Sequence, residues 1–497
     1  MLESTAMTYS ATTSSRRHFV VIVLLLAASP ALFSQGSPER LTPTTVITGA
    51  CSGHESEPGC VLPNLFGSNG LTLYNNPTFP HFAHFVGSSQ ATLNQTVSTA
   101  IATQLAILPI ISPSSGFTYR YDSASGAFVR SSTGLGPIYT ERAETIGRQK
   151  FSFGVSYQRF RFSKLDGIDL NNVPAVFTHV PNTGTGGVPE PYEADVINTV
   201  NSIDLKMDQT VLYGTFGLTD RIDVSVSVPI VDVRMSASSN ATILRVSGPT
   251  FVPAPGVPPA ANPHQFNAGG ALTNVYTSNG SATGIGDVTV RVKANIYNNE
   301  SLGVAVAADI RTPTGNAREF LGSGATGIRP FIAISGRRRF SPHVNLGFGW
   351  NGESILAGNL TGAIIGEDAA SNPTIQNGPP TKRSLPKQLT YAVGADAGVT
   401  RRLTLSFDYL GQTLFNAPRA FVANDLTQNI PGGTGTLTLP TVTGGTDTVG
   451  LNNGAAGLKY NLYGKLIVIA DLSFRLDNKG LRQNVTPLIA LSYQFGQ

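Results

Sequence analysis

Apolar and polar residues alternate in short stretches from about residue 149 to the end of the chain. Residues 285–297 show the pattern most clearly, with apolar side chains at every second position (Val288, Val290, Val292, Ala294 and Ile296) and polar ones between them (Thr289, Arg291, Lys293 and Asn295). A period of two, with one apolar and one charged face, is typical of a strand that separates two different media.

Twelve stretches of this kind follow one another with no helical pattern between them. We predict strands at about 149–164, 202–217, 221–236, 285–297, 301–312, 327–339, 343–353, 388–399, 402–414, 450–462, 465–476 and 484–496. Tight turns alternate with long connections, which is the pattern of outer-membrane barrels, with short turns in the periplasm and long loops outside. The predicted fold is all-β: a transmembrane antiparallel β-barrel of about 12 strands, preceded by an N-terminal non-barrel segment.

Two long connections carry further expectations. The connection 237–284 contains six prolines and is therefore predicted to be a loop over the barrel mouth, not a strand pair. Together with the connection 415–449, it offers apolar candidates for solute binding near the mouth, namely Phe251, Val252, Phe266, Leu414, Phe415 and Phe421.

The first residues predict export. Arg16 and Arg17 form a basic region, and residues 19–28 form an apolar region too short to span a bilayer as a helix. An ordinary secretory signal is favoured over a twin-arginine signal, because a barrel must cross the inner membrane unfolded. The expected division is a signal peptide (1–36), a periplasmic or plug segment (37–147) with a helix near 90–108 and a hairpin near 117–126, and the barrel (148–497). A disordered leader is the alternative for residues 37–147.

Composition narrows the function. Charged residues make up 13% of the chain, against a typical value of about 25%. The net charge of +4 is small and its basic residues are scattered, so nucleic acid is not an expected partner. Cys51 and Cys60 are predicted to form a disulfide in an oxidising compartment, and a metal site that also uses His54 is the weaker alternative.

The charged residues of the predicted strands all alternate with apolar neighbours, so we treat them as one set. Placed toward lipid, each charge at mid-membrane would cost about 2–4 kcal/mol, so the set is expected to line the lumen. These residues are Arg291, Lys293, Asp309, Arg311, Arg329, Asp396, Asp408, Lys459, Asp471 and Arg475. A network of charge pairs that fills the lumen is favoured, and a selectivity lining is the alternative. The predicted number of strands, twelve, is larger than that of small filled barrels and smaller than that of open pores. We therefore expect a modest channel that is narrowed or plugged.

No pattern of catalytic residues stands out, and neither an enzyme, a cofactor nor a bound metal is expected. Of seven histidines, only His343 falls in a predicted strand, beside Pro342, and we interpret it as a solvated turn residue.

Three stretches carry a family resemblance: Gly134 to Tyr157, Gly284 to Lys293, and Arg311 to Pro330. They resemble the outer-membrane family named for the phenol-degradation meta pathway, which is distantly similar to long-chain fatty-acid and toluene channels. The resemblance implies a channel in the outer membrane of a Gram-negative-type bacterium for uptake of small hydrophobic or aromatic molecules. A general porin or a passive structural outer-membrane protein is the alternative.

The same resemblance gives meaning to Pro229, which interrupts an otherwise regular strand. In the fatty-acid channels a kinked strand opens a lateral exit to lipid, so Pro229 is a candidate lateral opening, and a tolerated bulge is the alternative. The expected partners are outer-membrane lipid and lipopolysaccharide, a small hydrophobic solute, and the barrel-assembly machinery. The chain ends in a C-terminal aromatic signal displaced by two residues, with Phe495 before Gly496 and Gln497.

Overall fold

A computed structural model of the chain describes most residues after residue 50. The described residues are 51–67, 70–75, 85–86, 88–108, 111–113, 119–122, 127–130, 135–179, 194–246, 248, 250–251, 260–337, 339–360, 363–367, 373–377, 379–429 and 436–495. The predicted signal peptide (1–36) lies outside them, and the division of the chain into three segments stays a prediction.

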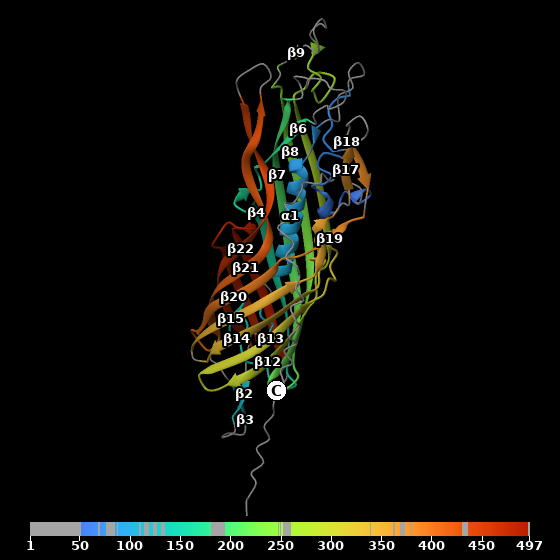
Figure 1. Cartoon of the computed structure of the whole chain (residues 1–497). Helices are drawn as coiled ribbons and strands as arrows, with labels where there is room; N and C mark the ends of the chain where they lie inside the picture. The colour runs from blue at the N-terminus through green and yellow to red at the C-terminus, as the bar shows by residue number, and fades with distance from the viewer. Residues whose placement is uncertain are drawn as a thin grey trace, which may run out of the picture. The chain divides into compact units, whose positions relative to one another are not determined.

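Twelve antiparallel strands close into a barrel (Figure 1). In order around the wall they are β4 (Phe151–Leu165), β7 (Val196–Gly217), β8 (Ile222–Leu244), β12 (Thr289–Asn298), β13 (Leu302–Arg311), β14 (Gly327–Gly336), β15 (Phe340–Asn351), β20 (Lys387–Gly398), β21 (Leu403–Asn429), β22 (Thr436–Tyr463), β23 (Leu466–Arg475) and β25 (Val485–Phe495). The barrel closes because β4 pairs with β7 on one side and with β25 on the other. The predicted fold class and its twelve strands are confirmed.

The remaining elements are shorter. Before the barrel come the 3-10 turn η2 (Pro58–Cys60), β1 (Phe85–Val86), the helix α1 (Ser88–Ile107) and the hairpin of β2 (Tyr119–Asp122) with β3 (Ala127–Arg130). Between the barrel strands lie β5 (Ile168–Asp169), β6 (Val173–His179), β9 (Thr250–Phe251), β10 (Ala260–Ala261), β11 (Thr273–Ile285), β16 (Glu353–Asn359), β17 (Ala363–Glu367), β18 (Pro373–Asn377), β19 (Thr381–Ser384) and β24 (Leu481–Gln483). The helix and the hairpin predicted before the barrel are thus confirmed.

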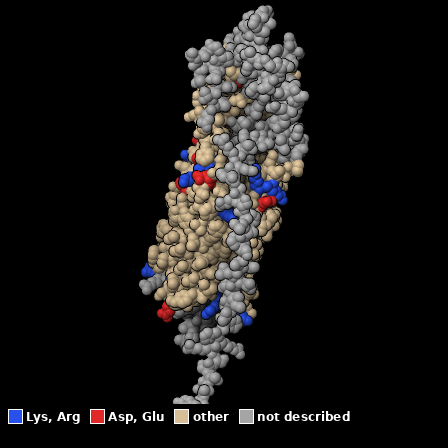
Figure 2. Space-filling view, viewed as in Figure 1, with Lys and Arg blue, Asp and Glu red and all other residues tan. Residues whose placement is uncertain are grey.

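Alternation along the strands produces an apolar outer face. On β25 every second side chain points outward, and Val485, Ile489, Leu491, Tyr493 and Phe495 are each 41–61% exposed. The face in view in Figure 2 has a broad zone largely free of Lys, Arg, Asp and Glu, with charged side chains above and below it. A closed ladder with an apolar outer face is suited to lipid, because it leaves no strand edge unpaired within the hydrocarbon. The chain is therefore a transmembrane β-barrel of the outer-membrane type.

Helices contribute little to the described fold. Among the described residues, no helix combines the length and the apolar composition that crossing a membrane requires.

Several strands run well beyond the membrane, which corrects two sequence expectations. β8 continues to Leu244 and pairs with β11 from Ile230 to Thr242, so the connection 237–284 does contain a strand pair. β21 and β22 likewise pair out to Asn429 and Thr436 inside the predicted loop 415–449. In the sequence, the prolines of 237–284 fall between Leu244, where β8 ends, and Thr273, where β11 begins. The extensions escaped prediction because polar side chains suit their solvent-facing positions, so the apolar and polar contrast weakens there.

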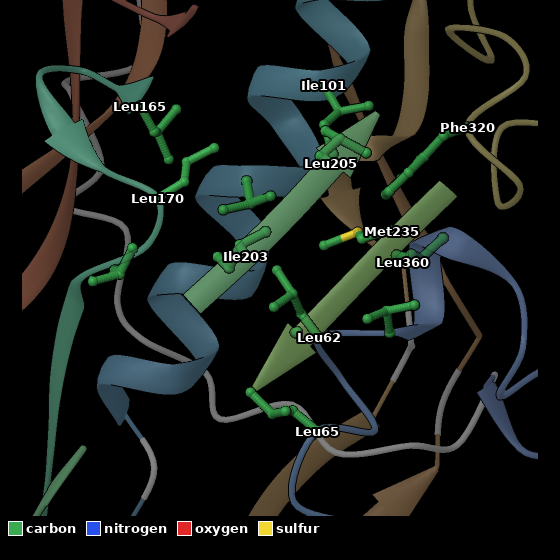
Figure 3. Close-up of a cluster of buried hydrophobic side chains, with 14 of the residues drawn as sticks. Leu62, Leu65, Ile101, Leu165, Leu170, Ile203, Leu205, Met235, Phe320 and Leu360 are labelled. Carbon is green, nitrogen blue, oxygen red and sulfur yellow. The ribbon is translucent and has the colours of Figure 1, made fainter. Parts of the chain in front are cut away.

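Above the membrane the strands enclose a hydrophobic core. α1 contacts β6, β16, β21, β22 and β24, and segment 51–66 packs on β8 and β11. Figure 3 shows buried side chains converging from segment 51–66, α1, β7 and β8, among them Leu62, Ile101, Leu205 and Met235.

A disulfide joins Cys51 to Cys60 at the edge of this core. Its loop docks on the inner side of β11, because Ser281 N donates to Ser56 O and the chain at Gly280 approaches Val61. The disulfide loop therefore contacts a strand that continues the barrel wall above the membrane.

The first prediction tests the apolar outer face. Ile489→Arg places a charge in the middle of β25, where the side chain is 61% exposed. The free energy of unfolding from lipid vesicles, measured by denaturant titration, should fall by about 2–4 kcal/mol. The control Tyr463→Arg, at the 85% exposed last residue of β22, should change it by less than about 1 kcal/mol. Equal effects at the two positions would contradict the assignment of this face to lipid.

Candidate functional site

Residues 135–147, called the lumen segment below, run through the inside of the barrel. Leu135 N donates to Thr404 Oγ1 of β21 at 2.9 Å, and Ala143 N donates to Ser335 Oγ of β14 at 2.9 Å. Ile146 N donates to Asp223 Oδ2 of β8 at 3.0 Å. These three strands lie at separate places around the wall, so the lumen segment crosses the interior near the end with the short turns.

Glu141 is the centre of the charge contacts of the lumen segment. Lys293 Nζ donates to Glu141 Oε1 at 2.8 Å and to the carbonyls of Arg142 at 3.2 Å and Glu144 at 2.7 Å. The Arg291 guanidinium bonds the second carboxylate oxygen of Glu141. Lys293 is 1% exposed and Glu141 is 2% exposed, so both charges are removed from bulk water and depend on each other.

Burial would raise the pKa of Glu141, but the attraction of Lys293 and Arg291 outweighs it and holds the pKa below its ordinary value. Glu141 is therefore ionised at neutral pH.

A second group of charges lies beside the first on β12, β13 and β14. Arg291 donates through Nε and Nη2 to the two carboxylate oxygens of Asp309, at 2.6 and 3.0 Å. Arg329 Nη2 donates to Asp309 Oδ2 at 2.6 Å. Both guanidinium groups lie over the ring of Phe331, at 5.0 and 5.7 Å from its centroid. One carboxylate thus orients two cations around an aromatic ring.

A third group surrounds His343 on β15. His343 Nε2 lies 2.9 Å from Asp408 Oδ1, and its Nδ1 lies 3.7 Å from Asp396 Oδ1. Thr140 of the lumen segment also donates to Asp408, at 3.0 Å. His343 is 2% exposed, so the interpretation of a solvated turn residue is wrong. Its inward position follows from the alternation of β15, in which Ser341 and His343 share a buried face.

The other predicted lumen residues also point inward. Lys459 is fully buried and donates to the carbonyl of Pro137, and Arg142 lies 3.8 Å from Asp396. Asp471 is 4% exposed and interacts electrostatically with Tyr139, and Arg475 is half-buried at the end of β23. These contacts favour a network of paired charges, and the selectivity role stays a prediction.

Arg311 joins four parts of the protein near the other side of the lumen. Its guanidinium donates to Ala106 O in the last turn of α1 at 2.9 Å, to Ala325 O at 3.2 Å and to Asn351 Oδ1 at 3.1 Å. Its Nε lies 3.5 Å from Asp287. A cation at a helix C-terminus is favourable, because the last carbonyls lack intrahelical donors.

A cavity of about 220 Å³ lies between the end of α1 and the lumen segment. Apolar side chains line part of it, including Leu105, Val231, Phe331 and Leu410, with Pro229 among them. Polar side chains line the rest, including Arg291, Arg329, Asn345, Gln388, Tyr391 and Gln412. Four of the predicted lumen residues, Arg291, Asp309, Arg311 and Arg329, therefore meet Pro229 at one site, which combines apolar surface with a few polar groups.

A metal site finds no support in the chemistry of the donors. The two cysteine sulfurs are joined to each other, and no group of three His, Cys, Asp or Glu side chains gathers as metal ligands within the described ranges.

Sequence reasoning missed the partners that the lumen segment supplies. Glu141, Arg142 and Tyr139 lie in Gly134 to Gly147, a stretch noticed only for its family resemblance. The sequence did contain a signal for such partners. The inward face of the strands carries many charged residues, and buried charges need partners.

Comparisons with known proteins give one family model and several solved structures that are similar to this chain. Residues 182–365 match the model of the family described as "Putative MetA-pathway of phenol degradation". Two of the three stretches that carried the resemblance, Gly284 to Lys293 and Arg311 to Pro330, lie inside this match, so the predicted resemblance is confirmed there. No curated protein matches the chain.

Solved outer-membrane structures are similar at low sequence identity. An outer-membrane channel from Pseudomonas putida F1 has 12% identity and a TM-score of 0.41, with 71% of this chain and 98% of that chain covered. The toluene transporter TbuX of Ralstonia pickettii has 10% identity and a TM-score of 0.30, with 70% and 90% covered. A FadL homologue of Pseudomonas aeruginosa has 10% identity and a TM-score of 0.30, with 77% and 96% covered.

The second prediction tests the central ion pair of the lumen. Glu141→Gln removes the carboxylate between Lys293 and Arg291 and leaves two buried cations with weaker partners. The free energy of unfolding should fall by roughly 3–5 kcal/mol, and limited proteolysis from the short-turn end should cut the lumen segment faster. The control Glu300→Gln, at an exposed turn position, should behave as wild type. Unchanged stability of Glu141→Gln would show that this pair does not hold the lumen segment.

The third prediction concerns the pH dependence of this contribution. The folded-state pKa of Glu141 lies below its unfolded value of about 4.3, so the stability it contributes is fully present above that value. It is lost as the pH falls through the lowered folded-state pKa. The difference in unfolding free energy between wild type and Glu141→Gln should therefore be constant from about pH 5 to 7 and shrink below about pH 4. A difference that already disappears near pH 6 would contradict the direction of the shift.

Proposed function

We propose that the protein is an outer-membrane channel for uptake of small hydrophobic or aromatic molecules. The cavity between α1 and the lumen segment carries this proposal, because it joins apolar surface to a few polar groups inside a membrane barrel. The family description, which refers to phenol degradation, agrees with it.

The size of the cavity favours a molecule with a single ring. Its volume is about 220 Å³. An apolar protein cavity of about 150 Å³ suffices to bind benzene, whereas sites for drug-sized ligands usually occupy about 300–1,000 Å³. The Phe331 ring offers an aromatic contact, and Gln388, Tyr391 and Gln412 could hydrogen-bond a hydroxyl substituent.

The charges of the lumen favour an exit other than the axial one. Toward the short-turn end the interior is crossed by the lumen segment and its buried ion pairs. An apolar molecule on this path would separate charges from their partners and gain nothing in return. A lateral path through the barrel wall at Pro229 would let the solute avoid these ion pairs.

At Pro229, β8 changes its neighbour. Residues Ile222–Ser227 pair with β12, whereas β8 pairs with β11 from Ile230 onward. Gly286 N donates to Pro229 O at 2.8 Å, but proline has no N–H to return the second bond of the pair. The carbonyl of Gly286 instead accepts a bond from Thr314 Oγ1 at 2.7 Å. At this point of the wall, a loop side chain, Thr314, therefore takes the place of a hydrogen bond between neighbouring strands.

Asp287 holds this loop in place. Its carboxylate accepts bonds from Gly315 N at 3.2 Å, Ser323 N at 2.9 Å and Ser323 Oγ at 2.5 Å. Outside the wall, the neighbouring residues Ile230, Ile285, Ile310 and Ile328 are 40–56% exposed and apolar. Displacement of residues 312–323 would connect the cavity to the lipid, which makes Pro229 the proposed lateral opening.

A general porin is the second candidate. The observation that favours it is the position of Arg329, whose side chain is 36% exposed and lines the cavity beside Asp309. A charged constriction of this kind would select solutes by size and charge. As with other barrels of its class, insertion by the barrel-assembly machinery is expected.

The fourth prediction separates these two functions. Cells that produce the protein should take up toluene-sized aromatics several-fold faster than cells without it, and their uptake of small sugars should not change. Both rates are measured with labelled solutes in the same strain background. Faster sugar uptake without a gain for the aromatic would favour the porin and reject the first proposal.

The fifth prediction tests the wall at Pro229. Pro229→Val restores an N–H that can bond Gly286 O and compete with Thr314, so aromatic uptake should fall several-fold while the barrel stays folded. The control Pro487→Val changes an exposed proline of β25 and should leave uptake unchanged. If Pro229→Val transports every hydrophobic solute as wild type does, Pro229 is a tolerated irregularity and the lateral opening is wrong.

A further inference from the structure

Three basic residues stand side by side on the outside of the barrel. Arg161 of β4 is the cross-strand partner of Lys206 of β7, and Lys206 is the cross-strand partner of Arg234 of β8. All three side chains lie on the outer face, alternating with buried neighbours. Directly opposed residues of neighbouring strands have Cβ atoms about 4.5–5.5 Å apart, and like charges in such positions destabilise a sheet. These three residues, called the basic row below, therefore do not stabilise the barrel by themselves, which indicates another role for them.

Neighbouring carboxylates balance the row only in part. Asp204 pairs with Lys206, and Asp232 lies 2.9 Å from Arg234. Asp208 is taken by Arg159 at 2.6 Å and by the Tyr157 hydroxyl at 2.7 Å. Among the residues that the structure describes, no carboxylate lies within 4.0 Å of the Arg161 guanidinium. The group keeps a net positive charge, most strongly at Arg161.

The row lies at the upper border of the lipid-facing zone. On the same strands, the outward positions toward the short-turn end are apolar, with Phe153, Leu212 and Val226 each 37–43% exposed. Farther from the short turns, the outward residues become charged, first at Arg159, Asp208 and Asp232. Beyond the basic row they are small and polar, as at Ser236 and Ser238. This border is the level at which lipid headgroups meet the barrel.

We propose that Arg161, Lys206 and Arg234 bind the phosphate groups of the glycolipid that forms the outer leaflet, the lipid A part of lipopolysaccharide. Guanidinium groups bind phosphate oxygens in pairs, and an ammonium between them adds a third donor. A phosphate in front of the row offsets the repulsion among its three cations. The acyl chains of the same lipid then lie along Ile230 and Leu212, which follow Asp232 and Asp208 toward the short-turn end, and this apolar contact distinguishes a lipid from a free anion.

The full-length protein, purified in detergent, is titrated with bis-phosphorylated lipid A and with the same lipid after removal of both phosphates. Binding is followed by native mass spectrometry. The variant Arg161→Gln with Arg234→Gln should bind the phosphorylated lipid at least tenfold more weakly than wild type. The matched control, Arg401→Gln with Arg402→Gln at an exposed short turn, should bind it as wild type does.

Three results would overturn the proposal. These are equal affinity of the wild type for the two lipids, an undiminished affinity of the Arg161 and Arg234 double variant, and displacement of the lipid by an equal concentration of inorganic phosphate. Loss of heat-modifiable gel mobility identifies a variant that has not folded. In that case the single variant Arg161→Gln, which breaks none of the ion pairs described above, decides the question by the same titration, with a several-fold loss of affinity expected.

Discussion

The hydrocarbon of a membrane offers no hydrogen bonds, and the structure follows from this constraint. Backbone groups in the wall must find their hydrogen-bond partners within the protein, chiefly in neighbouring strands, so the twelve strands close on themselves. Every charged side chain within the membrane must turn inward, where it again needs a partner. The lumen segment answers the second need, because Glu141 pairs with Lys293 and Arg291, and the carbonyl of Pro137 accepts a bond from Lys459.

The paired charges also decide what kind of passage the barrel provides. They occupy the half of the lumen near the short turns, whereas the half above the membrane is filled by α1 and the apolar core around Ile101 and Met235. The cavity lies where these two regions meet, beside the one place at which β8 exchanges β12 for β11. Solute binding and the irregularity of the wall are therefore parts of one arrangement.

Alternation predicted the fold wherever lipid lies on one side of the sheet. The strands β12 and β25 could be read from sequence because their outward residues must be apolar and their inward residues are not. The extensions of β8, β21 and β22 could not be read from sequence, because their outer face contacts water. Polar residues such as Ser236 and Thr242 are stable there, and their pattern does not differ from that of a loop.

The site was predictable in part for a similar reason. The inward direction of Arg291 and Lys293 follows from the strand period, but their shared partner Glu141 lies about 150 positions earlier in the chain. No local pattern encodes such a contact. His343 shows a different difficulty, since the neighbouring proline suggested a turn, whereas the alternation of β15 points the ring inward, where its Nε2 lies 2.9 Å from Asp408 Oδ1.

Solute binding in the cavity is tested most directly by locating a bound aromatic molecule. Crystals of the full-length protein, soaked in 4-bromophenol, would report the bromine by anomalous scattering. We expect bromine within the cavity, beside Phe331 and Leu410 and between α1 and the lumen segment. Bromine found only on the lipid-facing surface, with the cavity holding none, would contradict it.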